Sequence, residues 1–316
     1  MSAPLVTLTL NPAIDQTVTL EHLAPGAVHR ALASRADAGG KGVNVAGCLA
    51  DWGLPVTVTG VLGADNAAPF AAIFAAKGIE DRFIRVAGQT RTNLKLLDRH
   101  SGDTTDINLP GLTVTAGVFE AARARLLDAA GPGSRVVLAG SLPVGLAVDT
   151  YADLTRRLKA RGARVVLDAS GPALAAALAA EADALPEVVK PNRHELEDWA
   201  GRPLPTLAEV QAAALDLRAR GIPRVVVSLG QEGALFLDEG GVIHAHPPAI
   251  AVASTVGAGD ALVAGLVAAL HAGAGLDDTA RLALAFAAGK LTLAGANLPA
   301  RAEVERLAAA VRLTRP

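Results

Sequence analysis

The sequence contains very little of several residue types, and each shortage excludes a class of protein. Its only cysteine is Cys48, so no disulfide can form within the chain. Aromatic residues make up 3% of the 316 residues, which leaves few rings on which nucleic-acid bases could stack. The net charge is −2, so the chain lacks the excess of lysine and arginine that a phosphate backbone requires. We therefore expect no nucleic-acid partner.

The sequence also has no basic leader and no long apolar run. No basic residue precedes the apolar residues 5–10, so the start does not resemble a signal peptide. The longest apolar run, residues 261–270, is shorter than the roughly 20 residues that span a bilayer. In contrast, hydrophobic residues make up 51% of the chain, which is enough for a large core. These features predict a cytoplasmic globular protein with no membrane partner.

Short apolar runs alternate along the chain with longer Ala- and Leu-rich segments of helical period. Strands that are apolar on both faces and alternate with helices predict a mainly parallel α/β sheet covered on both sides. No linker, repeat or low-complexity tract divides the chain, so we expect residues 1–316 to form one domain. The expected strands are residues 6–10, 56–61, 135–139, 164–167, 187–190, 224–228 and 234–237. The expected helices are residues 43–52, 67–77, 118–130, 148–160, 207–220 and 260–271.

Two segments interrupt this alternation. Residues 16–36 and 89–112 show Thr-rich alternation and have no helix directly after them. Such runs occur both in small additional sheets and in plain surface hairpins. In parallel sheets, ligands bind beyond the carboxyl ends of the strands. We expect the two segments to pair as a small sheet that covers an active site there.

The segment STVGAGDA, residues 254–261, leads directly into an apolar helix. Its glycines let the backbone approach a ligand, and successive amides at a helix start bind anions. Asp260 in the first turn would accept a proton from a substrate hydroxyl beside that anion site. An acidic residue at a helix start is also common because the helix dipole favours it. The segment is not a dinucleotide fingerprint, because Leu262 stands in place of the third glycine, and the chain contains no P-loop motif.

A second glycine-rich segment, GGKGVNVA at residues 39–46, also opens a helix. Lys41 and Asn44 are three residues apart and therefore share one face of that helix. Lys41 would supply charge, and Asn44 directional hydrogen bonds, to a phosphorylated or hydroxylated ligand. A glycine-rich turn with a solvated lysine explains the segment equally well.

Two further polar segments follow expected strands. In TLNPAID, residues 9–15, the Asn-Pro pair makes a sharp exit, although Asn11 and Asp15 alone are ordinary turn residues. In KPNRHE, residues 190–195, Asn192 and Glu195 would share one face of a helical turn and hold a hydrated Mg²⁺ through water. The same pair equally suits a helix cap and its capping-box partner.

The order of these segments is more specific than any one of them. TLNPAID, GGKGVNVA, TRTN, GSLP, KPNxxE, VSLGxxGA and STVGAGDA follow one another, and this series resembles the PfkB branch of the ribokinase-like family over roughly residues 5–300. Within the branch, TDIN at residues 105–108 and the run KPNRHELEDWAGRPLP look most similar to the 1-phosphofructokinases. Tagatose-6-phosphate kinases and PfkB-type 6-phosphofructokinases are also similar. Many of those have Gly-Pro where this chain has Gly111 and Leu112.

The resemblance implies a central mainly parallel sheet flanked by helices, with a small β lid that often forms a homodimer contact. It implies ATP and Mg²⁺ as cofactors and a ketohexose phosphate as substrate, with fructose 1-phosphate converted to fructose 1,6-bisphosphate as the best match. It further implies that Asp260 is the catalytic base, with the amides of residues 256–259 as the anion hole, among them those of Gly257, Ala258 and Gly259.

The resemblance also assigns the remaining candidate site residues. Those implied to contact the sugar are Asp15, Gly40, Lys41, Asn44, Arg91, Asn93 and Ser141. Those implied on the magnesium and triphosphate side are Lys190, Asn192 and Glu195. Those implied at the adenine-nucleotide edge are Ser228, Gly230 and Gly233, with Thr255 nearby, and Gly257 is implied to bind the nucleotide as well.

Several alternatives stay open at this point. Arg91 and Lys41 are the better candidates for the sugar's existing phosphate, since a guanidinium can bind it through two hydrogen bonds. Lys95 and Arg30 are further candidates for substrate specificity to which the sequence gives no position. A kinase for a nucleoside or a free sugar is disfavoured by TLNPAID and by this cationic pair. A non-catalytic sensor on the same scaffold would bind a sugar phosphate without releasing ADP.

Overall fold

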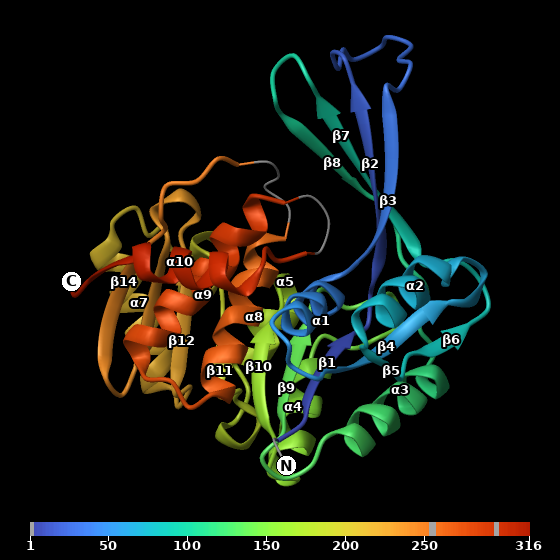
Figure 1. The fold of residues 1–316 in the computed structure, drawn as a ribbon. Helices are drawn as coiled ribbons and strands as arrows, with labels where there is room; N and C mark the ends of the chain where they lie inside the picture. The colour runs from blue at the N-terminus through green and yellow to red at the C-terminus, as the bar shows by residue number, and fades with distance from the viewer. Residues whose placement is uncertain (1–2, 253–256, 294–296) are drawn as a thin grey trace.

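The computed structural model describes residues 3–252, 257–293 and 297–316. In this part of the chain one large sheet has eleven strands and a second, smaller sheet has four (Figure 1). The strands of the large sheet are β1 (Leu5–Thr9), β4 (Thr57–Gly63), β5 (Glu80–Asp81), β6 (Ile84–Val86), β9 (Arg135–Ala139), β10 (Arg164–Asp168), β11 (Val188–Val189), β12 (Arg224–Ser228), β13 (Ala234–Asp238), β14 (Gly241–His246) and β15 (Arg312–Thr314).

The large sheet is mainly parallel, as predicted. Its order is β15-β14-β13-β12-β11-β10-β9-β1-β4-β5, with β6 beside β4. All neighbours from β5 across to β12 pair in parallel, and so do β4 and β6. Only β13, β14 and β15 at one edge pair antiparallel. The carboxyl ends of the parallel strands therefore meet along one side of the sheet.

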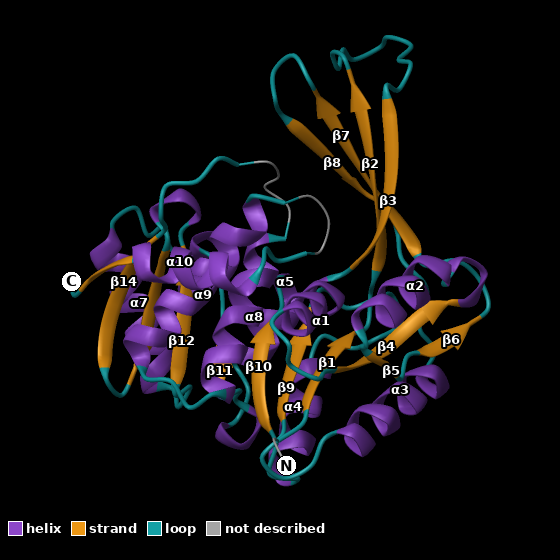
Figure 2. Cartoon of the chain, in the orientation of Figure 1, coloured by secondary structure: helices purple, strands orange, loops and turns teal. Residues whose placement is uncertain are grey.

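Helices cover both faces of the large sheet and divide the core in two (Figure 2). Successive residues of β9 alternate between the two clusters, with Val137 in one and Val136 and Leu138 in the other, as a pleated strand requires. The first face carries α1 (Lys41–Asp51), α2 (Ala68–Lys77), α8 (Ala258–His271), α9 (Leu276–Leu291) and α10 (Arg301–Ala310). The second face carries α3 (Ala116–Ala129), α4 (Thr150–Ala160), α5 (Gly171–Leu178), α6 (Arg193–Ala200) and α7 (Leu207–Ala219). Within the described residues no helix is long and apolar enough to cross a bilayer.

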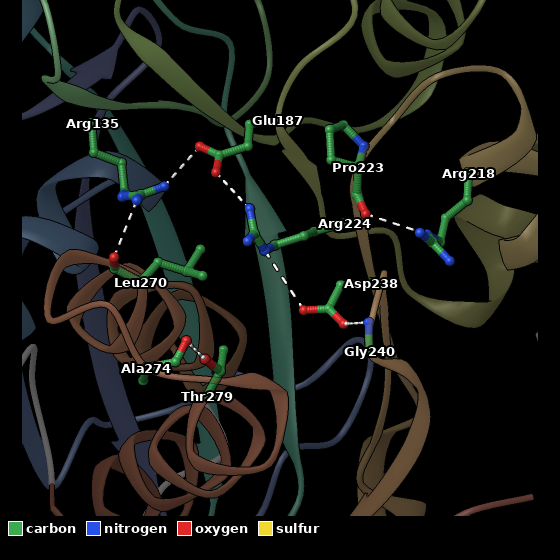
Figure 3. Close-up of polar contacts among 10 residues, drawn as sticks. All are labelled: Arg135, Glu187, Arg218, Pro223, Arg224, Asp238, Gly240, Leu270, Ala274 and Thr279. Carbon is green, nitrogen blue, oxygen red and sulfur yellow. Dashed lines mark hydrogen bonds and ion pairs between the residues drawn. The ribbon is translucent and has the colours of Figure 1, made fainter.

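An ionic network joins the amino ends of the strands to the last turn of α8 (Figure 3). Glu187 accepts hydrogen bonds from Arg135 at 2.8 Å and from Arg224 at 2.6 Å. Arg135 also donates to the backbone carbonyl of Leu270 at 3.2 Å. A cation near the carbonyl oxygens of a helix end is stabilising. The network thus fixes the C-terminal end of the helix whose first turn contains Asp260.

The four remaining strands form what we call the lid sheet, which stands away from the main body near α1 and α2 (Figure 1). Its strands, in order, are β3 (Ala33–Gly39), β2 (Ala13–Leu20), β7 (Arg91–Asp98) and β8 (Thr104–Asn108). Two antiparallel hairpins are joined by the parallel pairing of β2 with β7. The predicted small sheet is therefore confirmed. Its first hairpin, β2 and β3, begins earlier and ends later than the predicted residues 16–36. The reason is that the chain turns straight from β1 into β2 and continues from β3 almost directly into α1.

Candidate active site

A cavity of about 330 Å³ is lined by the lid sheet, by the first turns of α1 and α8, and by loops that follow β1, β9 and β10. Its walls include most of the predicted catalytic and sugar-binding residues: Asp15, Gly40, Lys41, Asn44, Arg91, Asn93, Ser141, Gly257, Ala258, Gly259 and Asp260. The same cavity contains Lys95, to which the sequence gave no position, together with Asn11, Ala13, Gly140 and Ser170.

The start of α1 depends on a close approach between two backbone segments. Gly40 is the N-cap, with φ 110°, a value that favours glycine. A Cβ at this position would lie 3.0 Å from the Cα of Pro12 and 3.0 Å from Cγ2 of Thr9. The turn places Lys41 and Asn44 in the cavity, as the helical spacing predicted.

Asp260 lies in the first turn of α8, after Gly257 in the left-handed region with φ 80°. Its side chain is buried, and Oδ2 accepts a hydrogen bond of 2.7 Å from Nδ2 of Asn44. Burial and the neighbouring charge of Asp168 raise the pKa of Asp260 to about 6, against the lowering effect of Lys41 and Asn44. The group is thus a carboxylate near neutral pH, with a higher proton affinity than an exposed aspartate, as a general base requires.

Asp168, a buried residue at the end of β10, was not among the site residues predicted from the sequence. Its Oδ1 accepts from Nζ of Lys41 at 3.0 Å and lies 3.2 Å from Nζ of Lys190. Although burial raises the pKa of Asp168, the two lysines outweigh it and lower that pKa. Burial likewise opposes the charge of Lys41, but Asp168 and Asp260 raise its pKa. The available signal was a carboxylate directly after an apolar strand, at the sheet edge where ligands bind.

The lid sheet places a row of polar side chains over the other end of the cavity. Arg91, Asn93 and Lys95 alternate along β7 and so share one face of the strand. Arg91 donates to the backbone carbonyl of Asn11 at 3.2 Å, and burial lowers its pKa. Asn93 donates to Oδ1 of Asp15 at 3.3 Å, and burial raises the pKa of Asp15.

The lysines of the cavity differ in their ion-pair partners. Lys95 forms an ion pair of 3.3 Å with Asp106 on the adjacent strand β8, and half of the Asp106 side chain is exposed. The Lys41 ammonium instead lies at the opposite end, with Asp168. Ser141 accepts a hydrogen bond of 3.1 Å from Asn11.

Of the described residues predicted for magnesium and nucleotide, Gly257 lines this cavity, and those that do not are Lys190, Asn192, Glu195, Ser228, Gly230 and Gly233. Asn192 and Glu195 form the capping box of α6, in which each side chain bonds to the other's backbone amide at 2.8 Å. The alternative of a helix cap is therefore confirmed, while a magnesium role for the pair stays a prediction. Ser228 ends β12 beside Asn192, and the turn from β12 to β13 contains Gly230 and Gly233. The predicted roles of Thr255 and Val256 fall on residues outside the described ranges.

Residues 8–303 match the family model of the pfkB family carbohydrate kinases, and the chain belongs to this family. It is 53% identical over 312 residues to a 1-phosphofructokinase of Xanthomonas campestris pv. campestris, an alignment that covers 98% of each chain. It is 40% identical over 313 residues to the 1-phosphofructokinase of Escherichia coli K12, with 99% of each chain covered.

Comparison with solved structures leads to the same family. A crystal structure of phosphofructokinase-2 from Escherichia coli, in complex with substrates and products, superimposes with a TM-score of 0.91 at 29% identity. The superposition covers 97% of this chain and 99% of that one. The chain is therefore a ribokinase-like carbohydrate kinase that uses ATP and Mg²⁺, as the order of its motifs predicted.

Proposed function

We propose that this chain transfers the γ-phosphoryl group of ATP to the C6 hydroxyl of fructose 1-phosphate, which gives fructose 1,6-bisphosphate and ADP. The observation that carries this proposal is the buried carboxylate of Asp260 at a helix N-terminus, in one cavity with Arg91 and Lys95. A base and an anion site at one end, with cations at the other, suit a sugar that already carries a phosphate. The identity of 53% to a 1-phosphofructokinase, over 98% of this chain, supports the same substrate.

Asp260 accepts the proton of the hydroxyl while the hydroxyl oxygen attacks the γ-phosphorus. A new oxygen–phosphorus bond forms, and the bond from the γ-phosphorus to the bridging oxygen breaks, which leaves ADP. The amides of Gly257, Ala258 and Gly259 face the charge that moves in this step, and Asn44 orients the Asp260 carboxylate. In phosphoryl transfer, positioning and electrostatic stabilisation do most of the work.

Mg²⁺ bound with ATP neutralises charge on the β- and γ-phosphates. The residues present fit such an ion, because Oδ2 of Asp168 is buried and has no hydrogen-bond partner among the residues that the structure describes. Carboxylate oxygens are preferred ligands of Mg²⁺, which usually keeps several of its waters. Asp168 would hold the ion directly, whereas Asn192 and Glu195, engaged in their capping box, would act through water.

The function is tested by a coupled assay of ADP release at fixed Mg·ATP. The panel contains fructose 1-phosphate, fructose 6-phosphate, tagatose 6-phosphate, ribose and adenosine. We expect the highest kcat/KM with fructose 1-phosphate. A preference for a 6-phosphate would replace the substrate but keep the mechanism, and turnover of ribose or adenosine would point to a free-sugar or nucleoside kinase. Binding of a sugar phosphate without ADP release from any of them would establish a sensor instead.

We expect Arg91 and Lys95 to hold the phosphate already on the sugar. Lys95 takes the place of Lys41 in the prediction from sequence, because the Lys41 ammonium is paired with Asp168. The variant Lys95→Met should raise KM for fructose 1-phosphate about 10- to 100-fold with a smaller change in kcat, because a charged hydrogen bond to substrate is lost. Steady-state kinetics at saturating ATP measure both constants. The control Asp106→Asn removes the anion that competes for Lys95, so its KM should stay level or fall. An unchanged KM in Lys95→Met would assign the phosphate to other residues.

The lid sheet is also the surface that we expect to form a homodimer. Half of the exposed large apolar residues in the described part of the chain lie in its strands and loops: Val28 at 96%, Leu32 at 52%, Ile107 at 42% and Leu109 at 40% exposure. Charge at such a contact should separate the subunits, so Ile107→Asp should sediment at the 31.9 kDa of one chain. The control Leu215→Asp alters an exposed leucine on α7 and should leave the dimer intact. A wild-type protein that already sediments as a monomer would contradict the expected contact.

A further inference from the structure

Lys290, near the end of α9, is a buried cation that the mechanism does not yet use. Its exposure is 3%, and it makes no hydrogen bond or ion pair through its side chain with residues 3–252, 257–293 or 297–316. The other deeply buried cations are paired, Lys190 with Asp168 at 3.2 Å and Arg135 with Glu187 at 2.8 Å. A lysine that is mostly buried, and that has no ion pair with a described residue, suits an anion bound near it, because a buried charge is costly without a compensating one.

The position of Lys290 points to the anion concerned. A Cβ on Gly257, the N-cap of α8, would lie 3.2 Å from Cε and 3.9 Å from Nζ of Lys290. The two helices also pack closely further along, since a Cβ on Gly265 would lie 2.8 Å from the Cα of Ala283. This packing holds the Lys290 ammonium beside the turn whose amides face the cavity.

The charged and titratable groups around Lys290 come from three elements. They are Asp260 on α8, Cys48 on α1, and Arg35 and Asp37 on β3. Burial lowers the pKa of Lys290, while Asp260 and Asp37 act in the opposite direction. Burial also raises the pKa of the Cys48 thiol to about 12, so this group is neutral and does not balance the charge.

We propose that Lys290 is a fixed positive charge behind the N-terminus of α8 that stabilises the phosphoryl group during its transfer. This role rests on the proposed kinase function. The helix N-terminus alone supplies only about half an elementary charge. A full charge beside it acts on the same phosphoryl group with greater strength. The same charge favours the ionised form of Asp260. Lys290 is therefore a positioning residue, which acts through the field at the anion site and not by contact with the sugar.

The test compares Lys290→Met, which is similar in length but uncharged, with Lys290→Arg, which keeps the charge. The Met variant should lose about 10- to 100-fold in kcat/KM for ATP, less than the loss of a direct oxyanion donor. The Arg variant should retain most of the activity. The acid limb of the pH profile, the fall of kcat at low pH, should move to higher pH in Lys290→Met only. The reason is that loss of a nearby cation raises the pKa of Asp260.

Two further variants separate this role from plain packing. In Lys290→Ala, added methylammonium should restore part of the activity. In Lys159→Met, which removes a lysine bonded to backbone carbonyls on α4, kinetics and acid limb should match the wild type. Met and Arg variants that lose stability and activity equally, with the acid limb unmoved, would show a packing role and overturn the proposal. A wild-type protein that phosphorylates none of the sugars would instead overturn the kinase function on which it rests.

Discussion

Replacement of Asp260 by asparagine is expected to lower kcat at least about 100-fold while ATP binding stays nearly unchanged. Asparagine has the same shape and can still accept the hydrogen bond from Asn44, but it cannot take up a proton. ADP release measures the loss in kcat, and calorimetric titration with a non-hydrolysable ATP analogue measures nucleotide binding. The folded structure should persist, because the amide fits the space of the carboxylate.

The pH dependence of kcat tests the same group. Since burial and Asp168 raise the pKa of Asp260 to about 6, and the base acts in its ionised form, kcat should fall as the pH drops through about 6. The residual activity of Asp260→Asn should lack this limb.

A matched control addresses the alternative that Asp260 serves only the helix dipole. Asp278 is also an aspartate in the first turn of a helix, α9, but is exposed. Asp278→Asn should change kcat little, because its effect is limited to the dipole interaction. Normal turnover by Asp260→Asn, or equal losses in the two variants, would rule out the proposed base.

The second large effect is expected on stability. Asp168→Asn leaves the ammonium groups of Lys41 and Lys190 without their buried carboxylate. Removal of one partner from a buried ionic cluster costs about 3–5 kcal/mol of the free energy of unfolding. Denaturant titration followed by circular dichroism measures the difference. As a control, Glu305→Gln breaks the exposed pair with Arg301 on α10 and should cost about 1 kcal/mol or less.

Asp168→Asn should also move the acid limb of kcat to lower pH. The negative charge of Asp168 raises the pKa of Asp260, so its removal lets that pKa fall. Lys41→Met should move the limb in the opposite direction, because Lys41 lowers the same pKa. Equal stability of wild type and Asp168→Asn, with the two limbs superimposed, would contradict the ionic cluster as described.

Much of the fold follows from local pattern. Six of the seven apolar runs that predict strands are parallel strands of the large sheet, and the seventh is the antiparallel β13. Their ends are displaced by at most two residues, because β-branched residues buried on both faces have few alternatives. Helices α5, α6, α9 and α10 were not predicted as such. The last turns of α9 lie against α8 and α10, so this helix is buried on several sides and lacks a clear polar stripe. The edge strand β15 is short and pairs with β14, which lies far from it in the sequence.

The family, and the set of residues that line the cavity, could be predicted from the amino-acid sequence alone. Glycine-rich turns and polar residues after parallel strands must meet at one edge of the sheet, so the neighbourhood of Asp15, Lys41 and Asp260 follows from their order in the chain. Which charged groups face one another could be seen only in the folded structure. Packing between elements distant in sequence creates three such arrangements. They are Asp168 between two lysines, Lys95 at the cavity, and Lys290 behind Gly257. No local pattern encodes such contacts, since the pKa and charge state of each group depend on neighbours that the fold alone supplies.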